Sequence, residues 1–208
     1  TMCNWSRKIA ESCEILLMIL KEEIRSGPLI NIDETPFQVL SEPNRSSQTK
    51  SYMWVFVGGD PDHPGILFEY HPTRAGSVPT VFLSGYQGVV QTDGYKAYNF
   101  IDDADGMDHM ACWAHVRRKF KDVVKAVGPS KNVKQKTGNA NQALKFIKKL
   151  TNIEKNAEKS GIVGDALLKE RQEKAKPILD SFEIWLDEKA KTTPPTSLLG
   201  QAITYALN

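Results

Sequence analysis

Two aspartates, each directly following a mainly apolar run, are the residues of this sequence best suited to chemistry. Asp33 follows residues 29–32 and Asp93 follows residues 88–92, and both runs have the character of buried strands. Carboxylate oxygens are the ligands that Mg²⁺ prefers. Two such ions about 3.5–4 Å apart can activate a water or hydroxyl and neutralise a phosphate under attack. The pair therefore suggests metal-dependent phosphodiester chemistry, with Asp33 bridging two ions and Asp93 holding one, although aspartates also commonly cap turns.

A second candidate group is basic and lies at the start of a helix expected near His115. His115 and Arg118 could contact a phosphate there, because helix N-terminal amides favour anions and arginine binds phosphate through paired hydrogen bonds. Lys119 and Lys121 are candidates for phosphate contacts that position a nucleic acid without reading its sequence. For His115, a structural role beside Trp113 is an equally good interpretation.

The elements that must position these residues alternate between strands and helices. Segments with strand character are residues 29–33, 52–57, 66–70, 88–93 and 109–113. Three strands in a meander, followed by strands reached through helical crossovers, are typical of the ribonuclease H-like topology. We therefore expect an α/β fold with a ribonuclease H-like mixed five-stranded sheet flanked by helices and a helical insertion after the fifth strand. In this topology the first and fourth strands are parallel neighbours, which places Asp33 and Asp93 at strand ends where such sheets bind ligands.

Four regions follow from these elements. Residues 1–27 are expected to hold an amphipathic helix from a preceding region, and residues 28–127 the ribonuclease H-like core. Residues 128–193 are expected to form the helical insertion, and residues 194–208 the start of a last helical region. Within the core, Glu34 should point to the opposite strand face from Asp33, as a supporting or surface residue.

Charge is distributed unevenly along the 208 residues. The net charge is +2, but residues 116–150 contain eleven Lys or Arg and one acid. Such a segment suits a protein that holds a polyanion, although a solvated lysine-rich helix face is the simpler explanation. The sparse, odd set of three cysteines favours a reducing compartment, and we expect a cytoplasmic location without a membrane-spanning or signal segment.

Several spaced motifs, taken in order, add to this interpretation. They are Asp33-Glu34-Thr35-Pro36; Gln91-Thr92-Asp93-Gly94-Tyr95 with Tyr98-Asn99; Cys112-Trp113-Ala114-His115 with Arg117-Arg118-Lys119-Phe120; and Pro194-Pro195 through Leu199-Gly200-Gln201-Ala202-Ile203 to Tyr205-Ala206-Leu207-Asn208. With these motifs the chain resembles the insertion-sequence-66 family of bacterial transposases, from about Ile32 to Asn208. Between residues 121 and 190 the resemblance rests mainly on helical character.

The resemblance implies a catalytic triad of two aspartates and a glutamate that cuts and joins DNA strands. Asp33 matches the first acid and Asp93 the second, bound to two Mg²⁺ ions, with Mn²⁺ as a substitute. The third acid would follow the motif that ends at Asn208, and Glu183 and Glu188 do not match it. By itself, the chain is therefore expected to bind metal weakly and to show little strand transfer. The implied partners are transposon ends, target DNA and further copies of the chain.

Two other functions remain open at this stage. A ribonuclease H-like, metal-dependent nuclease would share both aspartates but would not need the long helical insertion. A non-catalytic nucleic-acid-binding remnant would account for the missing glutamate. For Tyr95 and Tyr98, packing in the core is favoured over stacking on a nucleic-acid base.

Overall fold

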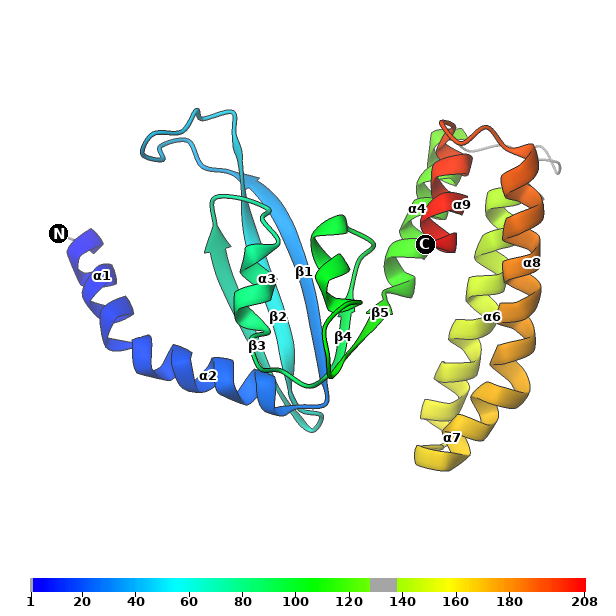
Figure 1. The fold of residues 1–208 in the computed structure, drawn as a ribbon, viewed down its shortest axis with the longest axis horizontal. Coiled ribbons are helices and arrows are strands. Elements are labelled where there is room, and N and C mark those ends of the chain that lie inside the picture. The colour runs from blue at the N-terminus through cyan, green and yellow to red at the C-terminus, as the bar shows by residue number, and fades with distance from the viewer. Residues whose placement is uncertain (1, 128–137) are drawn as a thin grey trace. The chain divides into compact units, whose positions relative to one another are not determined.

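The computed structural model describes residues 2–127 and 138–208, and the chain divides into two compact units. The first unit comprises Thr1–Cys112 and contains the sheet, and the second comprises Trp113–Asn208 and is helical (Figure 1). The sheet confirms the expectation of an α/β chain with a five-stranded mixed sheet. Residues 128–137, at the start of the expected helical insertion, lie outside the described residues.

The sheet has the strand order β3-β2-β1-β4-β5 (Figure 1). Its strands are β1 (Leu29–Gln38), β2 (Lys50–Asp60), β3 (His63–His71), β4 (Gly88–Thr92) and β5 (Met107–Ala111). The first three strands pair antiparallel, and β4 and β5 are parallel to β1. All five predicted strands are therefore present, and β1 and β4 are the parallel neighbours expected from the sequence.

The predicted ends of two strands are wrong. Asp33 does not end β1, which continues to Gln38 because residues beyond Asp33 keep pairing with β2. Pro36 is tolerated in this extension because β4 pairs with β1 only along Leu29–Asn31, so that this part of β1 is a sheet edge. The fifth strand ends at Ala111, where the chain turns into helix α4 (Trp113–Val127).

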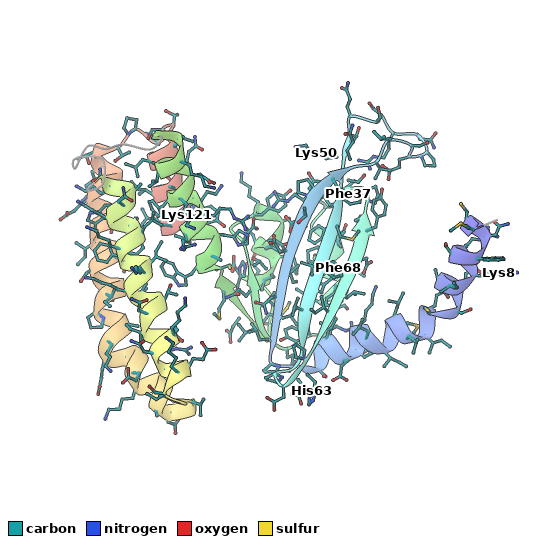
Figure 2. All side chains as sticks on the ribbon, turned by 180° about the vertical axis from the view of Figure 1, so that it is seen from behind. Lys8, Phe37, Lys50, His63, Phe68 and Lys121 are labelled. Atoms are coloured by element: carbon teal, nitrogen blue, oxygen red, sulfur yellow. The ribbon has the colours of Figure 1, made fainter. Side chains whose placement is uncertain are left out.

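Helices cover one face of this sheet and bury its alternating apolar side chains. They are α2 (Glu14–Ser26), α3 (Ser77–Phe82) and the 3₁₀ helix η1 (Lys96–Ile101), all of which contribute to the core of the first unit. Phe56 of β2 stacks on Phe82 of α3 with ring centroids 3.9 Å apart. The opposite face is more open, and Phe68 on β3 is 66% exposed there (Figure 2).

The N-terminal segment forms two helices instead of the single one expected. Helix α1 (Met2–Ser12) and α2 meet at Cys13, and α1 buries no residue. Only the end of α2 packs closely, where Ile24 lies against the glycines of β2 and β3. None of the helices in the described part of the chain is long and apolar enough to cross a membrane.

The second unit is built around aromatic side chains. Its elements are α4, α6 (Asn139–Lys159), α7 (Gly164–Glu170), the π-helical turn η2 (Arg171–Ala175), α8 (Lys176–Thr192) and α9 (Leu198–Leu207). Phe182 of α8 is 1% exposed and lies within 6.5 Å, between ring centroids, of Phe120, Phe146 and Trp185. Helix α4 packs against α6 and α9, so its contacts place it in this unit.

Candidate functional site

The strand register brings Asp33 and Asp93 to the same edge of the sheet. The last paired residues of β1 and β4 are Asn31 and Gln91, and both aspartates lie two residues further along. Because neighbouring strands are about 4.8 Å apart, this register directs the two carboxylates towards a common region. Both side chains are partly buried. The parallel pairing of β1 with β4 was predicted from the sequence, but Asp33 lies within β1 and Asp93 lies one residue beyond β4, so neither ends its strand.

Backbone amides orient both carboxylates. The amide of Glu34 donates to Asp33 Oδ1 at 2.9 Å, and the amide of Tyr95 donates to Asp93 Oδ1 at 3.0 Å. The other carboxylate oxygen of Asp93 lies 3.5 Å from Nη2 of Arg74. Each aspartate is therefore held in a defined orientation by the residues that immediately follow it in the chain.

Glu34 lies on the buried face of β1, as the alternation of the strand predicted. Its side chain is fully buried and accepts hydrogen bonds from Arg74 and from the hydroxyl of Tyr98. Burial raises the pKa of the Glu34 carboxyl, and the hydrogen bonds from Tyr98 and Arg74 oppose that rise. The alternative of a surface position for Glu34 is wrong, since the residue is only 7% exposed.

Tyr98 is a buried tyrosine whose hydroxyl binds Glu34. Its side chain is fully buried, which confirms the expected packing role. Burial raises the pKa of the Tyr98 hydroxyl, as do its hydrogen bond to Glu34 and the negative charges of Glu34, Asp93 and Asp33. We refer to Asp33, Glu34 and Asp93, whose negative charges all raise this pKa, as the acidic cluster.

Arg74 is a member of this cluster that the sequence analysis did not identify. It comes from the segment between β3 and α3, and its guanidinium lies 3.5 Å from the centroid of the Tyr95 ring. The Tyr95 hydroxyl in turn donates to the backbone oxygen of Arg74 at 3.4 Å. No sequence signal identifies this arginine, because its partners Glu34 and Asp93 lie 40 and 19 residues away in the chain.

A chain of hydrogen bonds supports the backbone of Asp93 and was also missed. The hydroxyl of the buried Thr92 donates to the backbone oxygen of Asp93 at 2.7 Å and lies 2.7 Å from Nε2 of His109. Nδ1 of His109 lies 2.7 Å from Oδ1 of Asp102. Nε2 of His109 is thus a second hydrogen-bond partner of the Thr92 hydroxyl, and which of the two groups donates depends on the tautomer of the imidazole. Strand β5 therefore helps to hold the start of the segment that carries Asp93.

The predicted phosphate-binding residues gather on a different element. His115, Arg118, Lys119 and Lys121 all lie on α4 in the second unit, whereas Asp33 and Asp93 belong to the first (Lys121 in Figure 2). The arginine and both lysines are exposed, and His115 is partly buried. The ammonium of Lys119 lies 5.0 Å from the centroid of the Tyr205 ring. Three cations on one helix are therefore available to an anionic partner.

The acidic residues suit a hard divalent cation. Asp33 and Asp93 supply carboxylate oxygens, and Mg²⁺ commonly binds through one or two carboxylates and keeps water in its other positions. Glu34 is occupied by Arg74 and Tyr98, so it is not available as a ligand in this arrangement. Within residues 2–127 and 138–208, no group of three or more His, Cys, Asp or Glu side chains is placed to hold a metal ion. Asp33 and Asp93 are therefore the residues of this site that could contribute oxygen ligands to a metal ion.

Comparisons with known proteins place this chain in a family. A family model described as "Transposase IS66 family" matches residues 1–208. Uncharacterized protein y4qI of Sinorhizobium fredii is 26% identical over 99% of this chain, and uncharacterized protein y4hP of the same organism is 27% identical over 91%. The chain spans only 38% and 36% of the lengths of these two relatives.

The similarity of this chain to a solved structure is weaker than the family match. One chain of a simian T-cell lymphotropic virus intasome, solved by cryo-electron microscopy in complex with PP2A regulatory subunit B56 gamma, superposes with a TM-score of 0.32 and 12% identity. The match covers 69% of this chain and 46% of that chain, and at this level it supports no argument about fold. The family match extends over the whole sequence and decides the assignment: the chain belongs to the IS66 family of transposases.

Proposed function

We propose that this chain carries two metal-binding acids of a transposase that cuts and joins DNA strands, on a sheet of the ribonuclease H-like type. The observation that carries the proposal is the β1–β4 register, which brings Asp33 and Asp93 to one edge, two residues beyond the last strand pair. Membership of the transposase family supports the choice of DNA as substrate. The strand order, with an antiparallel meander joined to two parallel strands, supports the fold type.

Each residue of the site has a distinct part in this proposal. Asp33 and Asp93 would hold Mg²⁺ through carboxylate oxygens, in a site that takes two ions when complete. Bound there, the metal supplies charge neutralisation at the phosphate and activation of the attacking water or hydroxyl. The amides of Glu34 and Tyr95 orient the two carboxylates. Mn²⁺, which takes the same oxygen ligands, is the practical probe.

For the DNA-binding surface, we propose the exposed basic residues of α4. Arg118, Lys119 and Lys121 are exposed and lie within four residues on one helix, together with His115. Such cations neutralise backbone phosphates and place DNA without reading its bases. Replacing Arg118 and Lys121 by glutamine should weaken binding to unrelated DNA sequences equally. It should also reduce the slope of log K against log salt by about one for each phosphate that is no longer neutralised. An unchanged slope would contradict this assignment.

Metal binding by the two aspartates is tested with Mn²⁺ and four forms of the chain. The forms are the wild type, Asp33→Asn, Asp93→Asn and the control Asp60→Asn. Asp60 is an exposed aspartate at the end of β2 that accepts a hydrogen bond from the Asp62 amide, so it resembles the candidates in position but lies away from them in the sheet.

Binding of a ligand to the folded state alone stabilises a protein by about 2.7 kcal/mol at one hundred times its Kd. We therefore expect Mn²⁺ to raise the melting temperature of the wild type and Asp60→Asn equally, and that of Asp33→Asn and Asp93→Asn much less. Comparing each form with and without metal cancels any loss of intrinsic stability. An Asp33→Asn response equal to that of the wild type would remove the basis of the proposal. DNA cleavage without joining, in a protein that binds metal through both aspartates, would favour a nuclease.

A further inference from the structure

The strand ladder does not extend as far as the two aspartates. Pairing between β1 and β4 ends at Asn31 and Gln91, and β4 itself ends at Thr92. Asp33 is still held by β2, opposite Val55, but Asp93 lies outside any strand. Some other interaction must therefore hold Asp93 beside β1.

Arg74 makes that connection. Its guanidinium contacts Glu34, the residue next to Asp33 on β1, and its Nη2 also lies 3.5 Å from Oδ2 of Asp93. One side chain thus spans β1 and the segment that follows β4. The planar, forked guanidinium suits this task, because it can bind two carboxylates at once.

The arginine is itself held on several sides. Glu34, its anchor, is fully buried and is fixed by Tyr98 of η1. The guanidinium lies over the ring of Tyr95, and the Tyr95 hydroxyl binds the backbone oxygen of Arg74. Its side chain is only 32% exposed. The geometry of Arg74 is therefore determined by two separate segments of the first unit, β1 and the stretch that leads from Asp93 into η1.

The pairing also adjusts the charge of the cluster. Asp33, Glu34 and Asp93 together carry three formal negative charges, and Arg74 offsets that of Glu34. The remaining charge of the two aspartates equals that of one divalent cation. Without Arg74, a third, buried carboxylate would remain unpaired next to the proposed ligands, which is costly.

We propose that Arg74, anchored by Glu34, is a positioning residue that holds Asp93 beside Asp33 before metal binds. This inference rests on the proposed function, because it assigns Arg74 a role in preparing that metal site. Arg74 acts through Asp93 and is not itself a ligand. Residues that orient metal ligands from behind commonly change metal affinity by 10–100-fold when they are replaced.

The first test is made without metal and compares Arg74→Gln with Arg45→Gln. Arg45 is a matched control, since it also pairs with a glutamate, Glu42, and lies 2.8 Å from Ser51 Oγ, but it belongs to the loop between β1 and β2. The readout is hydrogen exchange of the Tyr95 amide, which donates to Asp93. We expect this amide to exchange at least about ten-fold faster in Arg74→Gln and at the wild-type rate in Arg45→Gln. Equal exchange rates of this amide in Arg74→Gln and the wild type would overturn the proposal that Arg74 holds Asp93.

The second test measures the affinity for Mn²⁺ from the electron paramagnetic resonance signal of the free ion. We expect Arg74→Gln to bind Mn²⁺ about ten-fold more weakly than the wild type, and Arg45→Gln to bind it equally well. In a Glu34→Gln background the same Arg74 substitution should have a smaller effect, because the anchor is already lost. Arg74→Lys keeps the charge but not the fork, so it should recover only part of the affinity.

Each contrary result has its own meaning. Tighter Mn²⁺ binding by Arg74→Gln would show that Arg74 competes with metal for Asp93, which overturns the positioning role. Unchanged binding would overturn it as well. If Asp33→Asn and Asp93→Asn bind Mn²⁺ like the wild type, the proposed metal site is wrong. The role of Arg74 in preparing that site is then wrong as well. The metal-free exchange experiment still decides separately whether Arg74 holds Asp93.

Discussion

The hydroxyl of Thr92 offers a sharp test of how the segment carrying Asp93 is supported. Replacing Thr92 by valine removes that hydroxyl while nearly preserving the shape of the side chain and its preference for a strand. Thr92 is 1% exposed, and its hydroxyl donates to the backbone oxygen of Asp93 and is also hydrogen-bonded to His109 Nε2, with both distances 2.7 Å. Both hydrogen bonds are absent from the valine variant.

The expected loss of stability in Thr92→Val follows from these two hydrogen bonds. A hydrogen bond typically contributes about 1 kcal/mol net, so two amount to about 2 kcal/mol. Nε2 of His109 is left without its hydrogen-bond partner, and the His109 side chain is only 18% exposed, so little water can replace that partner. We therefore expect Thr92→Val to lower the free energy of unfolding of the first unit by about 2–3 kcal/mol. Thr92→Ser, which keeps the hydroxyl, should cost less.

Urea denaturation of the two variants and the wild type provides the assay. The fluorescence of Trp54, which is fully buried in the first unit, reports unfolding there, provided that Trp5, Trp113 and Trp185 are replaced by phenylalanine in every form. A Thr92→Val value within about 0.5 kcal/mol of the wild type would refute the reasoning, since surface-like substitutions give changes of that size. A serine variant less stable than the valine variant would refute it too.

Three further predictions concern packing and pH. Phe182→Ala should destabilise the helical unit by about 3–5 kcal/mol in urea, because a buried aromatic ring is removed, while the first unit keeps its stability. Gly27→Ala should cost about 1–3 kcal/mol or more in thermal unfolding, because the added Cβ would lie 2.0 Å from the oxygen of Gly59. The hydrogen bond from Arg171 lowers the pKa of the half-exposed Glu154, so the stabilisation is present above pH 4.5 and is lost as the pH falls through the lowered pKa. Arg171→Gln should therefore cost about 0.5 kcal/mol at pH 7 and nothing at low pH, and a difference that persists in acid would contradict this.

Much of the fold could be predicted because local patterns decide it. Alternating apolar residues identify β2 and β3, and Pro61 marks the turn between them, although the glycines that were also expected in this turn lie within β2. The ends of elements were harder to predict. β1 continues beyond Asp33 because β2 offers it a partner, and the break at Cys13 divides a helix that looks continuous in sequence. Pairing partners are long-range information that local propensity does not contain.

The candidate acids illustrate the same limit. Asp33 and Asp93 were predicted because each follows an apolar run and matches a family motif, both of which are local features. Arg74, His109 and Thr92 support Asp93, but each does so through side-chain contacts between segments distant in the chain or, for Thr92, through a hydroxyl whose partner is on another strand. No spacing rule connects Arg74 with Glu34, 40 residues away.

By itself, the sequence determined the class of the fold and the family, and it predicted the two acids on which the proposed chemistry depends. The order of apolar and polar residues decides whether a segment has helical or strand periodicity. The carboxylate side chains decide that a bound ion would be a hard divalent cation. The tertiary structure decided which groups meet those acids. The register of β1 with β4 brings Asp33 and Asp93 to one edge, and the packing of the loop before α3 places Arg74 between Glu34 and Asp93. Contacts of this kind depend on the arrangement of whole helices and strands, because a side chain contacts only the neighbours that the fold brings within a few ångströms.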